Sequence, residues 1–273
     1  MWPKFESKQH IFCLGLNPSP RSTTMYRHVL ETKGVNATYA GLNVARLNRP
    51  LIDGLLEQGF IGLTITMPYK AKILRYTHQQ SKEVREIGAA NTILNTKGSL
   101  KAFNTDWLGA LDSLKAATSL KRKKVLLLGA GDVAKAIIYG LIKENVEVCV
   151  VNRTPNKARS LSNYFGCEYA TLAALKKIDY DILINATSVG YRSSSRTRVI
   201  EPTLIRAGSV VLDVVFDPIE TQLIKDARSR GCKICTGLDM LIRQAQHQFE
   251  VFFGQAPEYH IFKAGYPIGR LKS

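Results

Sequence analysis

The sequence predicts an α/β protein of two domains, one of which is a Rossmann-type dinucleotide-binding domain. Three observations support this prediction. Apolar runs of strand length alternate with helical patterns along almost the whole chain, which is typical of sheets covered by helices. A glycine turn of the dinucleotide-binding type follows one of these runs at Gly129. The length of 273 residues is sufficient for two domains of ordinary size.

The region from Lys124 to Thr154 shows the clearest pattern. It begins with Val125–Leu128, an apolar run without polar alternation, as expected for a strand buried on both faces. After a glycine turn, a helical pattern places Val133, Ile137 and Leu141 on one stripe. The run 146–151 indicates a second strand. Strand, glycine turn, helix and strand together form the βαβ unit that binds dinucleotides.

The glycine turn itself contains the first group of candidate cofactor-binding residues. They are Gly129, Ala130, Gly131, Asp132, Val133 and Ala134. We expect Gly129 to permit the tight turn, Gly131 to let the backbone approach a pyrophosphate, and Ala134 to let the helix pack close to the strand. The helix N-terminus then offers N–H groups to the phosphates. Asp132 suits the helix dipole but lies close to the expected phosphate.

The end of the second strand indicates which dinucleotide is bound. An Asp or Glu there would hold the ribose hydroxyls of NAD, but this chain has Asn152, Arg153 and Thr154, with Lys157 one turn further on. A guanidinium and a hydroxyl suit an adenosine 2′-phosphate. We therefore expect NADP. The alternative is a basic helix start that faces only water.

The composition is that of a soluble globular protein, with 45% hydrophobic and 22% charged residues. We find no signal peptide and no apolar run long enough for a bilayer, so we expect a cytoplasmic protein with no membrane partner. Five cysteines is an odd, sparse number that favours reduced thiols. Cys232 and Cys235 form a CxxC in a predicted short strand, where they would face opposite sides. Core packing explains them better than redox chemistry, and no metal is expected.

The formal net charge of +16 raises the question of an anionic partner. The densest basic stretches are 121–124 and 192–198. Such charge is compatible with nucleic acid binding, but the basic residues are scattered and are not interleaved with aromatic ones. We therefore expect no nucleic acid partner. Solvated edges and attraction of small anionic ligands are the better interpretation.

Outside the βαβ unit, the alternation of strands and helices continues. The expected strands are 11–15, 37–42, 62–66, 181–185, 210–214 and 233–235. A hairpin should join 91–94 to 100–103 through a turn at 96–98. A loop is expected over 17–24. Helices are expected after it to about residue 33, over 46–58, from Lys70 onward, over 106–117, and finally over 238–253.

Eight motifs in this chain resemble, in order and spacing, those of the shikimate dehydrogenase family. They lie at 66–70, 88–92, 104–109, 129–131, 152–154, 185–190, 213–221 and 237–241, the last followed by Gln244. One such motif alone would be weak evidence, whereas eight in order are highly specific and cover nearly the whole chain.

The resemblance implies a substrate-binding domain of residues 1–104 plus 240–273 and an NADP-binding Rossmann domain of residues 105–239, with a cleft between them. It implies reversible, NADP-linked interconversion of 3-dehydroshikimate and shikimate, on the route to aromatic amino acids. The expected assembly is a monomer or a homodimer. The first alternative is a related enzyme that acts on quinate or another ring acid. The second, from a different class, is a non-catalytic ligand sensor.

The resemblance also assigns catalytic roles. It makes Lys70 the catalytic lysine and Asp106 its partner, which fits a reaction that needs a proton donor at a carbonyl oxygen. A carboxylate near Lys70 would orient the ammonium group and the reacting hydroxyl. The alternatives are a solvated lysine at a helix start for Lys70 and a helix cap for Asp106.

The remaining site residues are implied by the resemblance alone. The expected substrate-binding residues are Ser22, Thr24, Thr66, Asn91 and Gln244, and the further cofactor-binding residues are Thr187, Val214 and Gly237. Arg21 would either help to bind a carboxylate or face water. Asn91 would otherwise be a turn or backbone cap, and Gln244 a partly exposed helix amide.

The chain departs from the family pattern at several positions. Thr64 stands where Asn is usual, and Phe216 stands where Tyr is usual. The first loop is also altered, since Arg21 replaces a His and Met25 a Pro. Lost polar groups weaken recognition of one particular substrate. We therefore expect a divergent member, with slow turnover or a different preferred ligand.

Overall fold

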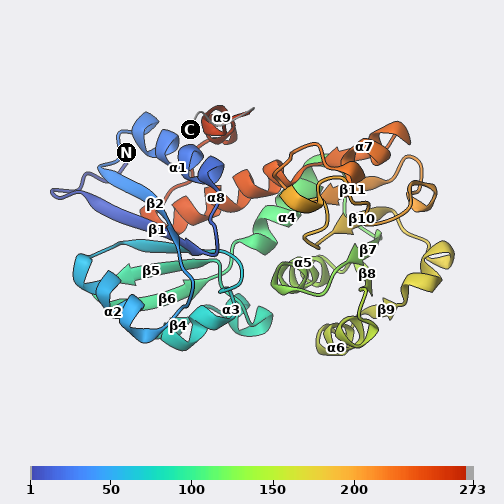
Figure 1. Ribbon diagram of the computed structural model, residues 1–273, viewed down its shortest axis with the longest axis horizontal. Helices are drawn as coiled ribbons and strands as arrows, with labels where there is room; N and C mark the ends of the chain where they lie inside the picture. The colour runs from blue at the N-terminus through green and yellow to red at the C-terminus, as the bar shows by residue number, and fades with distance from the viewer. Residues whose placement is uncertain (1, 269–273) are drawn as a thin grey trace. The chain divides into compact units, whose positions relative to one another are not determined.

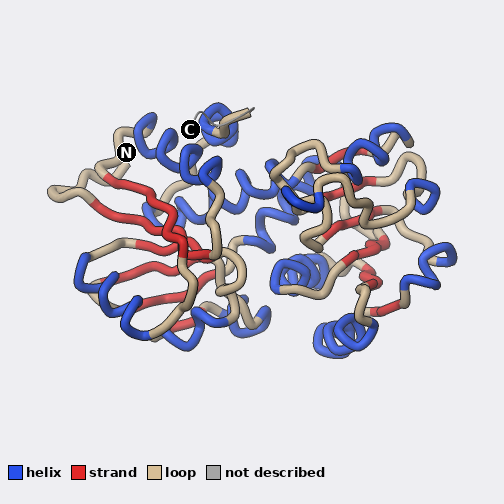
Figure 2. The backbone as a smooth tube through the Cα atoms, in the orientation of Figure 1, coloured by secondary structure: helices blue, strands red, loops and turns tan. Residues whose placement is uncertain are grey.

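The computed structural model describes residues 2–268. The chain forms two compact units, which are described separately (Figures 1 and 2). The first unit contains the residues up to Thr105 together with those from Ala245 onward, and the second contains Asp106–Gln244. Both units combine a six-stranded sheet with helices, so the predicted two-domain α/β class is confirmed.

The first unit is built on a mixed sheet. Its strands are β1 (Gln9–Gly15), β2 (Ala37–Asn43), β3 (Gly62–Ile65), β4 (Gln79–Gln80), β5 (Thr92–Thr96) and β6 (Ser99–Phe103). The spatial order is β2-β1-β3-β5-β6-β4. β1 runs parallel to both β2 and β3, whereas β5 is antiparallel to β3 and β6. The predicted hairpin is confirmed, with Lys97 and Gly98 both at positive φ in its turn.

Helices cover both faces of this sheet. They are α1 (Pro20–Thr32), α2 (Arg49–Gln58), α3 (Lys82–Ile87), α9 (Tyr259–Gly265), the C-terminal part of α8 (Gly237–Phe253), and the 3₁₀ helix η1 (Lys72–Tyr76). Ile52 of α2, Ile73 of η1 and Val84 of α3 share one apolar core with the sheet. The helices α1, α8 and α9 lie on the other side (Figure 1). Aromatic rings of these three helices meet, because Phe249 packs on Tyr26 and edge-on against Phe262.

The second unit has a sheet whose paired strands all run parallel. Its strands are β7 (Lys124–Leu128), β8 (Glu147–Val151), β9 (Glu168–Ala170), β10 (Ile182–Asn185), β11 (Val210–Asp213) and β12 (Lys233–Cys235). The spatial order is β12-β11-β10-β7-β8-β9. This is the order of the dinucleotide-binding fold, in which the direction of winding reverses between β7 and β10.

Both faces of this parallel sheet are covered, as its continuous apolar runs require. The α-helices are α4 (Asp106–Ala117), α5 (Asp132–Lys143), α6 (Pro155–Phe165), α7 (Gln222–Ser229) and the start of α8, and the 3₁₀ helices are η2 (Leu172–Lys177), η3 (Arg192–Ser194) and η4 (Pro202–Leu204). α4, α5 and α6 share one core with the sheet, and α7 contributes to the core of the opposite face. Within residues 2–268 we find no helix with the length and apolar character needed to cross a bilayer.

Four local predictions need correction. The loop expected over 17–24 is wrong from Pro20 onward, because proline is well suited to a first helical turn and α1 begins there. α2 begins at Arg49 and not at residue 46, since the side chain of Asn48 caps it by accepting from the N–H of Leu51. The helix expected from Lys70 is the 3₁₀ helix η1. The helix over 238–253 is not the last, because α9 follows it.

Candidate functional site

The candidate cofactor residues follow the strands of the second unit. Because these strands are parallel, their carboxyl ends lie along one edge of the sheet. The glycine turn follows β7, Asn152 follows β8, and Thr187 follows β10. Val214 comes directly after β11, and Gly237 begins α8 soon after β12. The structure therefore brings the predicted set to one sheet edge, on both sides of the switch point between β7 and β10.

The two glycines of the turn differ in what surrounds them. Gly129 has a φ of +118°, and a Cβ there would lie 2.9 Å from the carbonyl carbon and oxygen of Ala186. Only glycine fits this position. Gly131 precedes α5, and a Cβ built there would meet nothing within 4 Å. The space that a Cβ of Gly131 would occupy is therefore open, which is compatible with a dinucleotide bound close to this backbone.

Asp132 and Ala134 complete the start of α5. The Asp132 carboxylate lies 3.0 Å from Nζ of Lys135, one turn along the same helix, so its charge is offset locally. This pairing reduces the conflict between Asp132 and a nearby phosphate. Ala134 is fully buried in the core that joins α5 to the sheet, as expected for a small residue where helix and strand pack closely.

The basic residues after β8 face water. Arg153, Thr154 and Lys157 are all exposed. Thr154 precedes α6, but its hydroxyl does not cap the helix, and Asn152 donates from Nδ2 to the Thr154 carbonyl at 3.0 Å. Within residues 2–268, no hydrogen bond or ion pair holds the side chain of Arg153 or Lys157. A guanidinium at this place can turn toward an anionic ligand.

Gly237 has a packing role of its own. A Cβ at this position would lie 2.2 Å from the carbonyl oxygen of Val215, so only glycine allows α8 to begin against that loop. Thr236 and Asp239 form a capping box, in which the Thr236 hydroxyl donates to the Asp239 carboxylate at 2.7 Å and accepts from the Asp239 N–H at 3.2 Å. The capping box fixes the start of α8, and the absence of a side chain at Gly237 lets that start lie against the loop after β11.

Lys70 belongs to the first unit and follows β3 after a short turn. Its side chain is only 8% exposed, which is unusual for lysine. Its carbonyl accepts from the N–H of Ala90 at 2.8 Å. Burial raises the pKa of the nearby Cys13 thiol, while hydrogen bonds from Thr64 and Tyr39 and the charge of Lys70 oppose that rise. The alternative of a solvated lysine at a helix start is therefore not what the fold shows.

Asp106 belongs to the second unit and is the first residue of α4. It is 5% exposed. A carboxylate in the first turn is favoured by the helix dipole, so this position has a structural benefit besides any catalytic role.

The hydroxyls of Ser22 and Thr24 are not presented by a loop. Both residues lie in the first turns of α1, and side chains two positions apart on a helix point about 200° apart. Thr24 is exposed, and its hydroxyl donates to the Pro20 carbonyl at 3.0 Å. The two side chains therefore leave the helix in different directions, and their role in substrate binding stays a prediction. Arg21 is partly buried and donates to the carbonyl of Pro267.

Asn91 is 2% exposed, and its side-chain amide forms hydrogen bonds with the residues around it. Its Oδ1 accepts from the N–H of Thr105 at 2.8 Å and from the Thr92 hydroxyl at 2.8 Å, and its Nδ2 donates to the Thr105 hydroxyl at 2.9 Å. Gln248 of α8 joins this cluster, since its Nε2 donates to the Thr92 hydroxyl at 3.0 Å. The interpretation of Asn91 as a backbone cap therefore has direct support alongside a role in binding.

Thr66 and Gln244 complete the predicted substrate set. Thr66 follows β3 and is half-buried; its Cγ2 leaves no room for a side chain at Gly15, where a Cβ would lie 2.1 Å away. Gln244 is 8% exposed and not partly exposed as the alternative supposed. Its backbone lies against Gly109 of α4, where a Cβ would approach the Gln244 nitrogen to 2.8 Å.

The two departures from the family pattern differ in their surroundings. Thr64 is buried, and its hydroxyl forms a 2.6 Å hydrogen bond with the Tyr39 hydroxyl in the interior of the first unit. Phe216 is half-buried, with its ring centroid 6.2 Å from that of Tyr191. Thr64 therefore contributes to a core, whereas Phe216 lies in the loop that follows β11.

Sequence reasoning gave no role to Asn185 and Asp213, which prove to be central in the second unit. Both are fully buried at the carboxyl ends of β10 and β11. The available signal was the appearance of a polar residue directly after three apolar ones in each strand. The register that makes them partners joins residues 28 apart and could not be derived from either segment alone.

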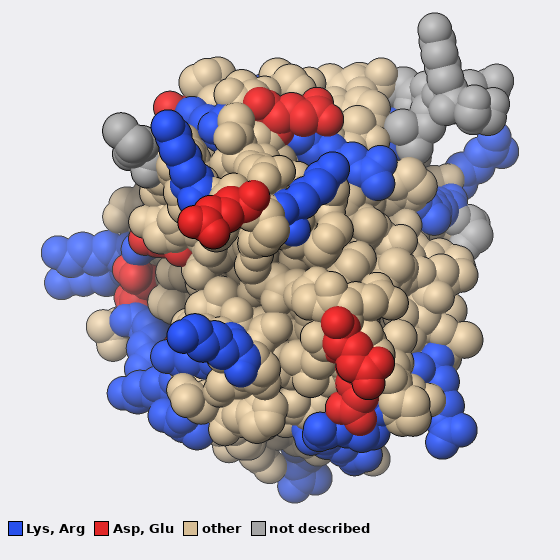
Figure 3. Space-filling view, turned by 90° about the vertical axis from the view of Figure 1, so that its left-hand side faces the viewer, with Lys and Arg blue, Asp and Glu red and all other residues tan. Residues whose placement is uncertain are grey.

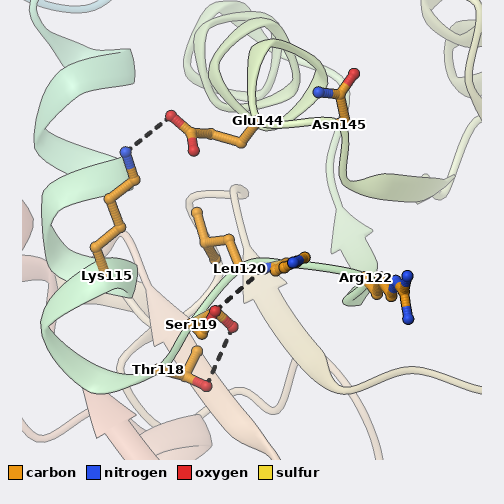
Figure 4. A pocket seen from close by; sticks show the side chains of 8 residues that line it. Lys115, Thr118, Ser119, Leu120, Arg122, Glu144 and Asn145 are labelled. Atoms are coloured by element: carbon orange, nitrogen blue, oxygen red, sulfur yellow. Dashed lines mark hydrogen bonds and ion pairs between the residues drawn. The ribbon is translucent and has the colours of Figure 1, made fainter.

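Other surface features do not belong to this site. A hollow lined by Lys115, Thr118, Ser119, Leu120, Lys121, Arg122, Glu144 and Asn145 lies before the amino ends of β7 and β8 (Figure 4). It is thus at the edge opposite the candidate cofactor loops, and the Lys115–Glu144 ion pair borders it. On the face drawn in Figure 3, basic side chains are separated by uncharged and acidic ones. Within residues 2–268 no cluster of His, Cys, Asp or Glu could hold a metal ion.

The cysteines have separate packing partners. Cys235 is buried and its thiol donates to the Ser113 carbonyl at 3.3 Å, whereas the partly buried Cys232 donates to the Arg206 carbonyl at 3.3 Å. Burial raises the pKa of the Cys235 thiol to about 12. The five thiols are unpaired.

Fold and site together define a two-domain α/β protein whose second unit is of the dinucleotide-binding type. Three family models match the chain: the shikimate dehydrogenase substrate binding domain at residues 18–93, shikimate/quinate 5-dehydrogenase at 112–213, and the shikimate 5′-dehydrogenase C-terminal domain at 237–264. The NADP(+) shikimate dehydrogenase of Pyrococcus abyssi is 37% identical, over 89% of this chain and 90% of the relative. The chain belongs to the shikimate dehydrogenase family.

Solved structures agree with this assignment. The shikimate 5-dehydrogenase of Thermus thermophilus, in complex with NADP(H) and shikimate, superposes with a TM-score of 0.87 at 30% identity, over 94% of this chain and 98% of that one. The quinate dehydrogenase of Corynebacterium glutamicum, in complex with NAD, also gives 0.87, at 26% identity over 96% and 99%.

Proposed function

We propose that this protein is an NADP-dependent oxidoreductase that interconverts 3-dehydroshikimate and shikimate. The observation that carries the proposal is that the family's lysine and aspartate are both present, as Lys70 and Asp106, and both are buried. Charged side chains are seldom buried unless they are paired or functional. Family membership supplies the substrate class.

The second unit would hold the cofactor at its carboxyl edge. The pyrophosphate would lie against the N–H groups at the start of α5, beside Gly131. Arg153 would bind the adenosine 2′-phosphate, with Thr154 and Lys157 near it. Bound NADPH would supply the hydride for reduction of the ring ketone. The openness beside Gly131 and the lack of any partner for Arg153 within residues 2–268 support this assignment.

Lys70 would handle the proton. In the reducing direction its ammonium group gives a proton to the carbonyl oxygen as the hydride reaches the carbon, and in the oxidising direction the neutral amine takes that proton back. Asp106 would orient the ammonium group and stabilise its charged form. The roles of Thr66, Asn91 and Gln244 would be to bind ring hydroxyls. Ser22 remains the candidate for the substrate carboxylate, since the Thr24 hydroxyl is bonded to Pro20.

A steady-state assay of NADP reduction with shikimate tests the proposal. Lys70→Ala should lower kcat at least about a hundredfold, on the usual scale of acid–base groups. The matched control is Lys72→Ala, two residues away, because Lys72 is exposed and its ammonium group lies over the Tyr69 ring; its kcat should match the wild type. Wild-type turnover in Lys70→Ala, or none in the wild type itself, would refute the assignment.

A second candidate activity is the oxidation of quinate. It is favoured by the similarity to a quinate dehydrogenase structure and by Phe216, which has no hydroxyl where the family pattern has Tyr. The same assay with quinate, each substrate tested with NADP and with NAD, separates the two. A higher kcat/KM for quinate than for shikimate would make quinate the substrate. We further propose a cytoplasmic location, which the five unpaired thiols support.

A further inference from the structure

Two buried polar residues join the ends of neighbouring strands in the second unit. Asn185 ends β10, Asp213 ends β11, and the parallel register places them opposite each other. Both are fully buried. The Nδ2 group of Asn185 donates to Oδ1 of Asp213 at 2.9 Å, so the two side chains form a direct link between the strand ends.

Asn185 also fixes the loop that follows β10. Its Oδ1 accepts from the Thr187 N–H at 3.0 Å and from the Thr187 hydroxyl at 2.7 Å. Its Nδ2 donates a second time, to the carbonyl of Val189 at 3.1 Å. The Thr187 hydroxyl in turn accepts from the Val189 N–H at 3.1 Å. One side chain therefore determines the path of residues 186–189.

Asp213 fixes the loop that follows β11 at both of its ends. Its Oδ1 accepts from the Val215 N–H at 3.0 Å, where the loop begins. Its Oδ2 accepts from the Thr221 hydroxyl at 2.6 Å, where the loop ends and α7 starts. Thr221 caps α7 by accepting from the Ile224 N–H at 3.2 Å. The loop over 214–221 thus starts and finishes on the same carboxylate.

The position of these loops in the sheet indicates which half of the cofactor they face. A dinucleotide-binding sheet holds one nucleotide on each side of its switch point. The glycine turn and Arg153 belong to the side of β7 and β8, which under the proposed function takes the adenosine half. The loops after β10 and β11 belong to the other side and therefore face the nicotinamide half.

We propose that Asn185 and Asp213 form a positioning pair that holds Thr187 and Val214 in place for the nicotinamide half of the cofactor. Neither residue needs to touch the cofactor. The inference rests on the proposed function, because that function assigns the cofactor. A buried carboxylate with three donors is costly to desolvate, and a strand end that had only to be covered could be closed by an apolar residue.

The test measures binding without turnover, with two probes. NADPH reports on both halves of the site, and 2′,5′-ADP reports on the adenosine half alone. Asp213→Asn keeps the shape but places an amide NH₂ where the carboxylate accepted a donor, so NADPH should bind at least about tenfold more weakly. Binding of 2′,5′-ADP should stay at the wild-type level. In turnover, the KM for NADP should rise while the KM for shikimate stays unchanged.

Two further variants sharpen the test. Asp226→Asn is the matched control, because Asp226 is also buried in this unit but binds Arg198 and Gln222, which lie outside residues 186–189 and 214–221; it should bind both probes as the wild type does. Thr221→Val removes one donor from Asp213 and should weaken NADPH binding selectively, and Thr221→Ser should restore it. These variants decide the question if Asp213→Asn does not fold.

The outcomes are distinct. Selective loss of NADPH affinity in Asp213→Asn or Thr221→Val supports the inference. Wild-type NADPH affinity in these variants overturns it, and so does equal weakening of NADPH and 2′,5′-ADP, which would indicate a general structural defect. Failure of the wild-type protein to bind 2′,5′-ADP would overturn the proposed function, and this inference with it.

Discussion

Gly109 offers a sharp test of how closely two helices of the second unit pack. It lies within α4, where replacing Gly by Ala normally stabilises a helix by about 0.5–1 kcal/mol. Here a Cβ would lie 2.7 Å from Cβ of Gln244, 2.8 Å from its nitrogen, and 2.8 Å from the Met240 carbonyl oxygen. Two of these neighbours are backbone atoms of α8, which cannot rotate away as a side chain can.

The magnitude follows from these distances. Non-bonded carbon atoms prefer about 3.5–4.0 Å, so α4 and α8 must separate by about 1 Å to admit the methyl group. Overpacking of this kind costs about 1–3 kcal/mol. After the helix-propensity gain is subtracted, Gly109→Ala should lower the free energy of unfolding by about 1–2 kcal/mol.

Two other helical glycines provide graded controls. In Gly140→Ala, on α5 of the same unit, the methyl group would lie 3.1 Å from Cγ of Leu111, a side chain that can adjust, so the effect should be near zero. In Gly54→Ala, on α2, nothing lies within 4 Å, and the variant should gain about 0.5–1 kcal/mol. Urea and thermal unfolding of the three variants give the order. Equal stability of Gly109→Ala and Gly140→Ala would refute the reasoning.

Three further predictions concern single side chains. Arg153→Ala should raise the KM for NADP about tenfold, the lower range for a lost charge-assisted hydrogen bond, and leave the KM for NAD unchanged. Steady-state kinetics with both cofactors measure this, and equal effects on the two KM values would show that Arg153 does not bind the 2′-phosphate. Tyr39→Phe should cost about 1–3 kcal/mol in urea unfolding, because Thr64 loses its buried 2.6 Å partner, and an unchanged midpoint would contradict it. Burial raises the pKa of Asp213 to about 6, about two units above an unfolded-state value near 3.9. The folded protein therefore binds this proton more tightly, and the group's contribution to the free energy of unfolding should fall by about 2 kcal/mol as the pH rises from 4 to 7. Asp213→Asn removes that contribution, so its unfolding curve against pH should differ in slope from the wild type, and parallel curves would argue against the shift.

The elements that the sequence predicts best are those with strong local signals. Val125–Leu128 has no polar residue, and the glycine turn directly follows it, so the βαβ unit could be placed from a short window. The hairpin was predictable because Gly98, which tolerates positive φ, lies in a short turn between two runs of strand length. The α9 helix was missed because it has only seven residues and is held by Phe262 packing on distant rings.

Within the candidate site, too, residues with a local signal were easier to predict than residues whose position depends on distant parts of the chain. The glycines of the turn could be placed because their positions depend on the backbone next to them, whereas the role of Arg153 stays a prediction. Ser22 and Thr24 were expected in a loop, but helix α1 begins at Pro20 and turns them to different sides. The partnership of Asn185 and Asp213 depends on strand register. Such register is set by tertiary packing, so single-sequence reasoning could not provide it.

The sequence order of the first unit has a consequence for synthesis on the ribosome. Its six strands emerge early, but Gln248, Phe249 and Phe262, which pack on its buried aromatic rings, follow the whole second unit in the chain. The second unit is translated in full before they appear. Tyr26 and Tyr39 therefore stay uncovered by these helices while the nascent chain grows. A message that stops near residue 244 would release a product whose aromatic core is exposed.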